Sequence, residues 1–255
     1  MEEKIKIIAA MIKKAHNIAV FTGAGVSTES GIPDFRSPGG FWTRFDPDDF
    51  SIDKFLSSLE TRKRIWNILQ EEVSLWEAQP NAAHLAFAEL EKMGRVKSVI
   101  TQNIDNLHQK AGNSPSIIFE LHGNMNWLIC LGCGRRYPVE LARQCATSSD
   151  GLPECRSCYG ILKPDITFFG EPLPDKAFIN ATLHAQECDL LIVVGSSLLV
   201  YPAADIPLFA KQGGAEVVII NIGETQHDDI ADVIINQSAG ETMTRIMDRL
   251  KEMDK

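Results

Sequence analysis

The chain has 255 residues, of which 44% are hydrophobic and 23% charged, and its formal net charge at pH 7 is −9. No apolar run approaches the roughly 20 residues that span a bilayer, and the acidic, amphipathic N-terminus is unlike a signal peptide. An acidic chain is also a poor ligand for a phosphate backbone, so we expect no direct nucleic-acid binding, no membrane association and a cytoplasmic location.

The first predicted elements are an amphipathic helix over residues 2–15 and a buried strand over 18–22. The strand runs into Gly23-Ala24-Gly25. A tight glycine turn after a strand leaves backbone N–H groups bare, with no Cβ to obstruct a ligand, and this suits a pyrophosphate. Thr28 stands where a dinucleotide-binding turn usually has its third glycine, so an ordinary strand-to-helix turn is the alternative.

Residues 28–50 lack clear periodicity and contain several prolines and glycines. A loop of this length in a compact domain is usually functional, so we interpret it as a mobile lid over the glycine turn. Within it, Phe35 and Arg36 offer a large ring and a fixed cation beside a nucleotide, although a core phenylalanine and a surface arginine fit equally well. Helices are expected over 53–76 and 81–93.

The next strand, over 96–101, ends in Gln102-Asn103-Ile104-Asp105. Ligands of open parallel sheets bind at the carboxyl ends of the strands. Amide and carboxylate side chains at such a tip can hydrogen-bond a ribose or a carboxamide. Polar strand tips are common, so this motif is weak by itself.

A further apolar strand, over 117–121, is followed by His122. Of the six histidines in the chain, His122 alone stands at the predicted active edge of the sheet. An imidazole with a near-neutral pKa at this place favours a general base. We interpret His84 and His108 as structural residues.

Residues 124–165 break the alternation of strands and helices and contain two Cys-x-x-Cys pairs. Two such pairs form a strong signature of a tetrahedral zinc site, and four thiolates leave no open coordination position. The sequence therefore predicts a structural zinc ion, and a thioredoxin-like redox role is disfavoured. Cys145 and Cys188 remain as an unliganded and a buried thiol. The predicted ligands are Cys130, Cys133, Cys155 and Cys158.

Residues 163–171 are interpreted as an extended segment that re-enters the main domain with an exposed edge. Such an edge can accept a substrate strand by main-chain pairing, and a core strand is a compatible alternative. Gly195-Ser196-Ser197 and Asn221 follow later apolar strands. The remaining predicted elements are helices over 175–187, from about 202 and over 240–253, and strands over 190–194, 217–220 and 233–235.

These elements predict an α/β fold with a doubly wound, mostly parallel, Rossmann-like sheet that binds a dinucleotide and carries an inserted zinc-binding module. We expect residues 1–123 and 166–255 to form the NAD-binding domain and 124–165 to form a small zinc ribbon. Part of the segment 28–80 is expected to pack with that module.

Taken together, the motifs resemble the sirtuin family of NAD-dependent protein deacylases, of bacterial or archaeal type. The resemblance covers nearly the whole chain, and its several blocks occur in the same order. The blocks are residues 23–27, 31–36, 101–105, His122-Gly123, the four paired cysteines, 168–171, 195–197 and Asn221.

The resemblance implies a cleft between the two domains, with NAD as co-substrate and zinc as a structural ion. The pyrophosphate would lie on Gly23, Ala24 and Gly25, within a shell that includes Thr28, Arg36, Ser196, Ser197, Asn221 and Ile222. The nicotinamide would be enclosed by Phe35, Ile104 and Asp105. Ribose and an ordered water would be positioned by Ser27, Gln102 and Asn103. The catalytic residues would be His122, as general base, and Asn103.

The implied activity is NAD-dependent deacetylation of lysine in peptides or proteins, with transfer of the acetyl group to ADP-ribose and release of nicotinamide. Family members that favour succinyl or malonyl groups carry a Tyr and an Arg three residues apart, and the matching positions are Leu69 and Glu72. An apolar wall and a like charge disfavour an acidic acyl group, so we expect a neutral one. Thr167 departs from the apolar β-branched residue common in the family.

Several other functions share parts of this pattern. Mono-ADP-ribosyl transfer and removal of other neutral acyl groups are near alternatives, because they begin with the same bond cleavage. An NAD-dependent oxidoreductase would carry an acidic residue at the end of a second strand, about 20 positions past the glycine turn. Residues 40–50 contain acids, but no strand is predicted before them. A non-enzymatic zinc-ribbon adaptor would not need His122, Asn103 and Asp105 together.

Overall fold

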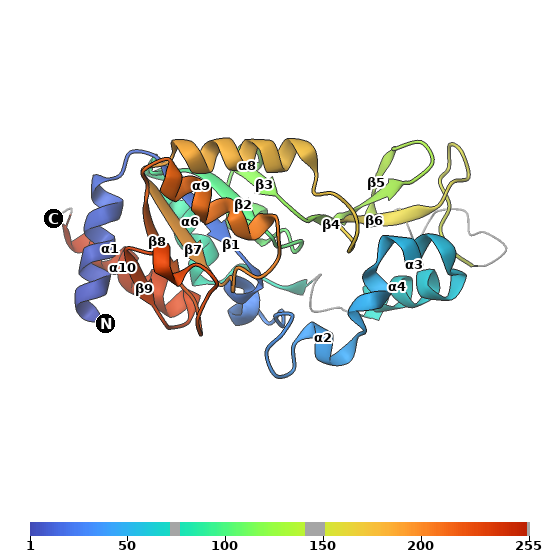
Figure 1. Ribbon diagram of the computed structural model, residues 1–255, viewed down its shortest axis with the longest axis horizontal. Coiled ribbons are helices and arrows are strands. Elements are labelled where there is room, and N and C mark those ends of the chain that lie inside the picture. Colours follow the sequence, from blue (N-terminus) through green and yellow to red (C-terminus); the bar gives the residue numbers. More distant parts are fainter. Residues whose placement is uncertain (72–76, 141–150, 254–255) are drawn as a thin grey trace.

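A computed structural model describes residues 1–71, 77–140 and 151–253 and contains two sheets (Figure 1). The larger sheet has six strands in the order β3-β2-β1-β7-β8-β9, and every pair of neighbours is parallel. Its strands are β1 (Ile18–Thr22), β2 (Val96–Thr101), β3 (Ile118–Glu120), β7 (Leu190–Val194), β8 (Glu216–Ile220) and β9 (Val233–Ile235). The predicted doubly wound α/β fold is confirmed.

The order of the strands determines where a ligand can bind. From β1 the chain adds β2 and β3 on one side, and then crosses back to add β7, β8 and β9 on the other. The strand order therefore reverses between β1 and β7, which pair in register from Ile18 opposite Leu190 to Thr22 opposite Val194. In open α/β sheets the binding crevice lies at this switch point, beyond the carboxyl ends of the strands.

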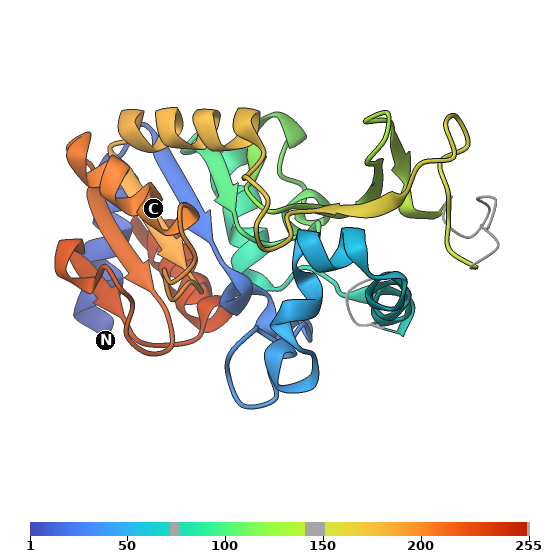
Figure 2. The same ribbon diagram turned by 45° about the vertical axis from the view of Figure 1, so that its right-hand side comes forward.

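Helices cover both faces of the larger sheet because its strands are apolar on both sides. In β1, Ile18 and Val20 join the core on one face, whereas Ala19 and Phe21 join the core on the other. The first face packs against α1 (Glu2–Lys14), α6 (Ala82–Lys92) and α10 (Ala239–Met253), and the second against α8 (Asp175–Glu187) and α9 (Ile206–Gln212) (Figures 1 and 2).

The smaller sheet lies at the end of the molecule away from the two termini (Figure 1). It is antiparallel, in the order β5-β4-β6, and is formed by β4 (Gly123–Cys130), β5 (Arg136–Pro138) and β6 (Leu162–Ile166). Helices α3 (Ile52–Ser57) and α4 (Leu59–Glu71) pack beside it and share one core with it. That core joins Phe55 and Trp66 to Leu128, Leu162 and Phe168.

Two predicted elements differ from the structure. The helix expected over 53–76 is divided at Ser58, whose backbone is extended and whose Oγ accepts a hydrogen bond of 3.1 Å from Thr61 N at the start of α4. Apolar periodicity continues across this break, so periodicity did not reveal it. The segment 163–171 does not join the larger sheet, because its strand β6 pairs with β4 in the smaller one.

Shorter helices account for the other differences. The segment 28–50 contains the end of a 3-10 helix (Ala24–Ser30), α2 (Phe41–Arg44) and a second 3-10 helix (Pro47–Phe50). The helix expected from about 202 begins as a 3-10 turn (Ala203–Asp205) before α9. Cys145 lies outside the described residues. Within the described residues, no helix combines the length and apolarity that a membrane crossing needs.

Candidate active site

The turns that follow β1 and β7 pack against each other at the switch point. Gly23 N donates to Val194 O at 3.1 Å, and Gly25 N donates to Gly195 O at 2.8 Å. A Cβ on Gly23 would lie 2.8 Å from Gly195 O, and one on Gly25 would lie 2.8 Å from Gly195 Cα. The expectation of bare N–H groups is therefore wrong for Gly23 and Gly25. These positions need glycine because backbone meets backbone there.

Gly195 provides a direct test of this packing. Its φ is +64°, and an added Cβ would overlap Val26 N and lie 2.8 Å from Gly25 Cα. We expect Gly195→Ala to lower the free energy of unfolding by about 3 kcal/mol or more, from left-handed strain plus overpacking. Gly214→Ala is the matched control, because φ there is +92° and nothing lies within 4 Å.

Denaturant unfolding of both glycine variants measures the difference. Gly214→Ala should lose only about 1 kcal/mol, from backbone strain alone. Equal losses of unfolding free energy in the two variants would show that the turns after β1 and β7 are not closely packed.

A buried hydrogen-bond network stands at the tip of β2. Ser27 Oγ donates to Asp105 Oδ2 at 2.7 Å, and Asn103 Nδ2 donates to Ser27 Oγ at 3.1 Å. The other carboxylate oxygen of Asp105 accepts from Leu107 N at 2.9 Å. All three polar side chains are buried. Because both oxygens of Asp105 are held, the network presents fixed donors and acceptors to the space above the sheet.

The next polar pair joins the tips of β2 and β7. Gln102 Nε2 donates to Ser196 Oγ at 2.8 Å, which links the residues after these two strands across β1. The backbone carbonyl of Gln102 lies 2.9 Å from Nδ1 of His122. A carbonyl only accepts, so Nδ1 carries the proton and Nε2 of a neutral imidazole is left as the acceptor. Burial lowers the pKa of His122 below 6.5, although its bond to Gln102 opposes this effect.

Two other histidines, His84 and His108, are bonded to residues of strand and helix ends and not to the cavity. His108 Nε2 is 2.9 Å from Thr22 Oγ1, which itself donates to Thr101 Oγ1 at 2.8 Å. His84 Nδ1 accepts a 3.4 Å bond from Asn81 N in the capping box of α6. Burial lowers the pKa of His84 to about 4 and that of His108 well below its usual range. Both rings are thus neutral structural groups, as predicted.

One cavity of about 520 Å³ gathers the predicted site residues. Its wall includes the turns after β1 and β7, the tip of β2, His122 and part of the segment 28–50. The predicted residues on this wall are Gly23, Ala24, Gly25, Ser27, Phe35, Arg36, Gln102, Asn103, Ile104, Asp105, His122, Ser196, Ser197, Asn221 and Ile222. Thr28 instead lines an adjoining cavity of about 120 Å³, shared with Gly25 and Asn221.

Sequence reasoning missed an aromatic cluster on the same wall. Phe35 lies 5.3 Å from Trp42 between ring centroids, and Trp42 lies 5.4 Å from Phe50 and 5.9 Å from Phe169. These rings join the segment 28–50 to the segment after β6, and all of them line the cavity. The density of aromatic residues in a loop without periodicity was a usable signal. The sequence did not show that these rings would contact Phe169, which lies far along the chain.

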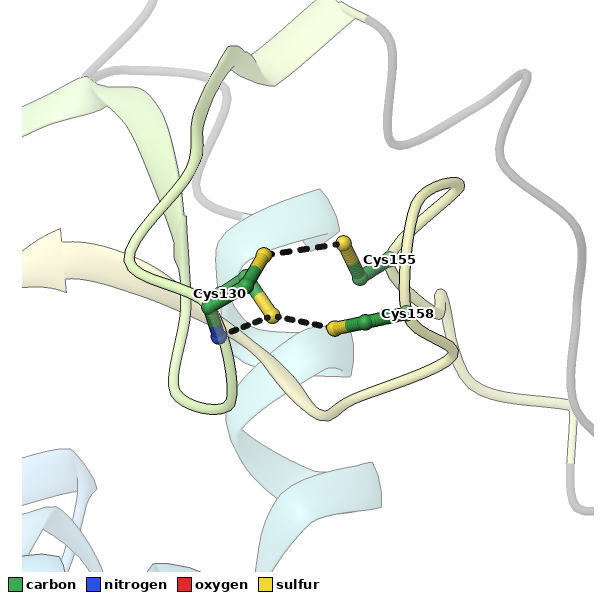
Figure 3. A group of neighbouring side chains, drawn as sticks. Cys130, Cys155 and Cys158 are labelled. Atoms are coloured by element: carbon green, nitrogen blue, oxygen red, sulfur yellow. Dashed lines mark hydrogen bonds between the residues drawn. The ribbon is translucent and has the colours of Figure 1, made fainter.

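The four paired cysteines converge at the tip of the smaller sheet. Their sulfur atoms all lie within 4.8 Å of one another, with Cys130 Sγ 3.5 Å from Cys158 Sγ and Cys133 Sγ 3.7 Å from Cys155 Sγ. Figure 3 shows Cys130, Cys155 and Cys158 pointing toward a common centre. Sulfurs bound at about 2.3 Å to a tetrahedral zinc ion lie about 3.8 Å apart, so the donor set fits zinc.

A family model for the Sir2 family matches residues 23–202, which include the glycine turn, the polar tip, His122 and the cysteines. The chain belongs to the Sir2 family. The predicted resemblance to sirtuins is confirmed.

Relatives in the Sir2 family are similar over almost their whole length. An NAD-dependent protein deacetylase of Thermodesulfovibrio yellowstonii is 46% identical over 98% of this chain and 96% of its own. An NAD-dependent protein deacylase of Archaeoglobus fulgidus is 42% identical over 99% of this chain and 98% of its own. Both names state that NAD is required and that an acyl group is removed from protein. The first specifies an acetyl group, and the second names acyl groups in general.

Solved Sir2 structures share the fold of this chain. A Sir2 complex with a deacetylated p53 peptide and 3'-O-acetyl ADP-ribose has a TM-score of 0.87 and 40% identity, covering 96% of this chain and 97% of the other. A Sir2 protein bound to a propionylated peptide has a TM-score of 0.84 and 40% identity, covering 96% and 98%.

Proposed function

We propose that this Sir2-family protein is an NAD-dependent protein lysine deacetylase that transfers the acetyl group to ADP-ribose and releases nicotinamide. The observation that carries the proposal is the position and bonding of His122. Its Nδ1 is tied to Gln102 O, its pKa is lowered, and it shares one cavity with the Ser27–Asn103–Asp105 network. The similarity to named deacetylases and to a structure with acetyl ADP-ribose supports the same reaction.

The predicted NAD-binding residues divide into three groups in this proposal. We assign the pyrophosphate side of NAD to Gly23, Ala24, Gly25, Thr28, Arg36, Ser196, Ser197, Asn221 and Ile222. We assign the nicotinamide to Phe35, Ile104 and Asp105, and the ribose and an ordered water to Ser27, Gln102 and Asn103. The strand tips suit a polar nucleotide, and the aromatic cluster suits exclusion of water from the reacting atoms.

His122 acts as the general base in this proposal, with Asn103 as the second catalytic residue. Cleavage of the nicotinamide bond leaves an electron-poor ribose carbon, which the acyl-lysine oxygen captures only if it is held in line. Nε2 of His122 then takes a proton from a ribose hydroxyl, and the freed oxygen attacks the acyl carbon. The bond from this carbon to the lysine nitrogen breaks, the lysine leaves as the free amine, and the ordered water adds to the carbon, so that the acyl group stays on ADP-ribose. A neutral imidazole with Nδ1 already bonded has the tautomer that this step needs.

The metal has no part in these steps. We propose that Cys130, Cys133, Cys155 and Cys158 hold a zinc ion that supports the fold of the smaller sheet. Four thiolates fill its coordination sphere. We also propose the division into an NAD-binding domain, 1–123 and 166–255, and a zinc module, 124–165. The six strands of the larger sheet come from the first part, and α3 and α4, from the segment 28–80, share a core with the second.

We propose a neutral acyl group as the substrate. Leu69 and its neighbour Ile68 are buried apolar side chains on the cavity wall, and they offer no partner to a carboxylate. Glu72, the other position in this prediction, lies outside the described residues. Removal of propionyl or similar groups is a second candidate, because one relative is named a deacylase and one similar structure holds a propionylated peptide.

We further propose that acetyl-lysine peptides or proteins are the partners and that the protein is cytoplasmic. The net charge of −9 supports basic, lysine-containing peptides over nucleic acid as ligands.

Mass spectrometry of an acetylated peptide, with and without NAD, tests the proposed reaction. We expect loss of the acetyl mass only with NAD, together with nicotinamide and acetylated ADP-ribose. A succinylated peptide of the same sequence is the matched control, and its turnover should be lower by at least about tenfold, because burying an unpaired carboxylate is costly. ADP-ribose attached to the peptide or to another protein would instead identify a transferase.

A further inference from the structure

One buried cation lies beside the active cavity and has no part in the steps above. Lys163 on β6 is 3% exposed. Of the lysines and arginines that the structure describes, it is the one that is buried. Lysine is almost never buried without a partner. Its Nζ lies 2.8 Å from Glu171 Oε2 and 2.5 Å from Ile166 O, and 4.4 Å from the centre of the Phe168 ring.

The Lys163–Glu171 pair closes a loop of the chain on itself. The carboxylate oxygen that accepts from Lys163 also accepts from Phe168 N, at 2.7 Å. One oxygen therefore ties the strand β6 to the backbone of the segment that follows it. That segment, residues 167–170, lines the cavity, and so does Glu171.

Backbone hydrogen bonds also hold this segment, and one of them is local, from Glu171 N to Phe168 O at 3.0 Å. Thr167 N donates to His122 O at 2.9 Å, which couples the segment to the backbone of the proposed base. Phe169 N donates to Phe50 O at 2.9 Å, and Phe169 O accepts from Ile52 N at 3.0 Å, which couples it to the start of α3. Within this segment, Phe168 N is the amide that donates to the carboxylate of the ion pair.

We propose that Lys163 and Glu171 are a positioning pair: they fix residues 167–170 as the wall that receives the acyl-lysine side chain, and they do not touch the reacting atoms. The kinetic part of this inference rests on the proposed deacetylase function. Residues 167–170 follow a strand of the smaller sheet, whereas Gly23 and Ser196 follow strands of the larger one. We therefore expect the pair to affect the peptide and not NAD.

Steady-state kinetics of Lys163→Met separates positioning from a merely structural role. Met has a similar volume and no charge, so it leaves Glu171 without its cation. We expect KM for an acetylated peptide to rise roughly tenfold and KM for NAD to stay within about twofold, because misplacing one wall weakens the alignment of one substrate. An equal rise in both KM values, or no rise in either, would overturn the inference.

Two further variants guard against a general folding defect. Glu171→Gln keeps the size of the side chain and its acceptor for Phe168 N, and it should give the same selective rise. Lys211→Met is the matched control, because Lys211 donates to Asp232 Oδ2 at 2.7 Å and that oxygen also accepts from Val217 N at 2.7 Å. This second pair also joins a lysine and a backbone amide through one carboxylate oxygen, but it is more exposed and lies away from the cavity, so both KM values should stay unchanged.

Amide hydrogen exchange tests the pair without any turnover. In Lys163→Met, the amides of Phe168 and Phe169 should exchange at least about tenfold faster, while those of β7 stay protected. Unchanged exchange at 168 and 169 would overturn the inference even in an active enzyme. A wild-type protein that does not deacetylate peptides would remove the proposed function, and the exchange result would still decide whether the pair orders this segment.

Discussion

His122→Ala should lower the rate of peptide deacetylation by about 10³-fold, because it removes a positioned general base. His122 is the histidine of the cavity wall, and its Nδ1 is already bonded to Gln102 O. Release of deacetylated peptide, followed by mass spectrometry, measures this loss. NAD should still bind, because the turns after β1 and β7 do not depend on the imidazole.

The pH profile gives a second, independent measure of the same residue. Burial lowers the pKa of His122 below 6.5, and the base must be unprotonated to accept a proton. The value of kcat/KM should therefore rise with pH through a midpoint below 6.5 and level off near neutrality. In His122→Ala this acidic limb should disappear from the residual activity.

His184→Ala is the matched control for the histidine substitution. His184 lies on α8, where its ring packs against Phe119 at 4.9 Å between centroids, and it does not line the cavity. Its removal should leave both the rate and the pH profile unchanged. Wild-type rates in His122→Ala would refute the assignment of the base.

Removal of zinc should have the largest effect on stability. Structural zinc sites contribute of order 10 kcal/mol to folding, so chelation or Cys130→Ser should lower the thermal midpoint by at least about 10 °C. Cys130 and Cys155 belong to the same core as Leu69 and Phe168, which line the cavity. Peptide deacetylation should therefore be lost together with the smaller sheet.

Metal analysis and thermal unfolding test this expectation. The wild type should hold one zinc per chain, and added zinc should restore the midpoint after chelation. Cys188→Ala is the control, since Cys188 is a buried thiol in the core between the larger sheet, α8 and α9. Its zinc content should equal that of the wild type. A stable, active protein without metal would contradict the assignment of a structural site.

Local sequence determined much of this protein. The strand 190–194 and the helix 175–187 have the predicted bounds. The pattern of apolar residues that predicts a strand or a helix is contained within the element itself. The two Cys-x-x-Cys pairs predicted the sulfur cluster, since this spacing is itself a local geometry. Polar residues directly after apolar strands predicted the cavity wall, because parallel strands bring their carboxyl ends to one edge.

Only the tertiary structure decided which distant groups meet. It is the contact with Gly195, from a turn far along the chain, that excludes a side chain at Gly23 and Gly25. The assignment of β6 to the smaller sheet, the joining of Trp42 to Phe169 and the burial of Lys163 against Glu171 all depend on packing between segments. A sequence pattern specifies which side chains share a face. The packing of one element on another specifies what that face touches.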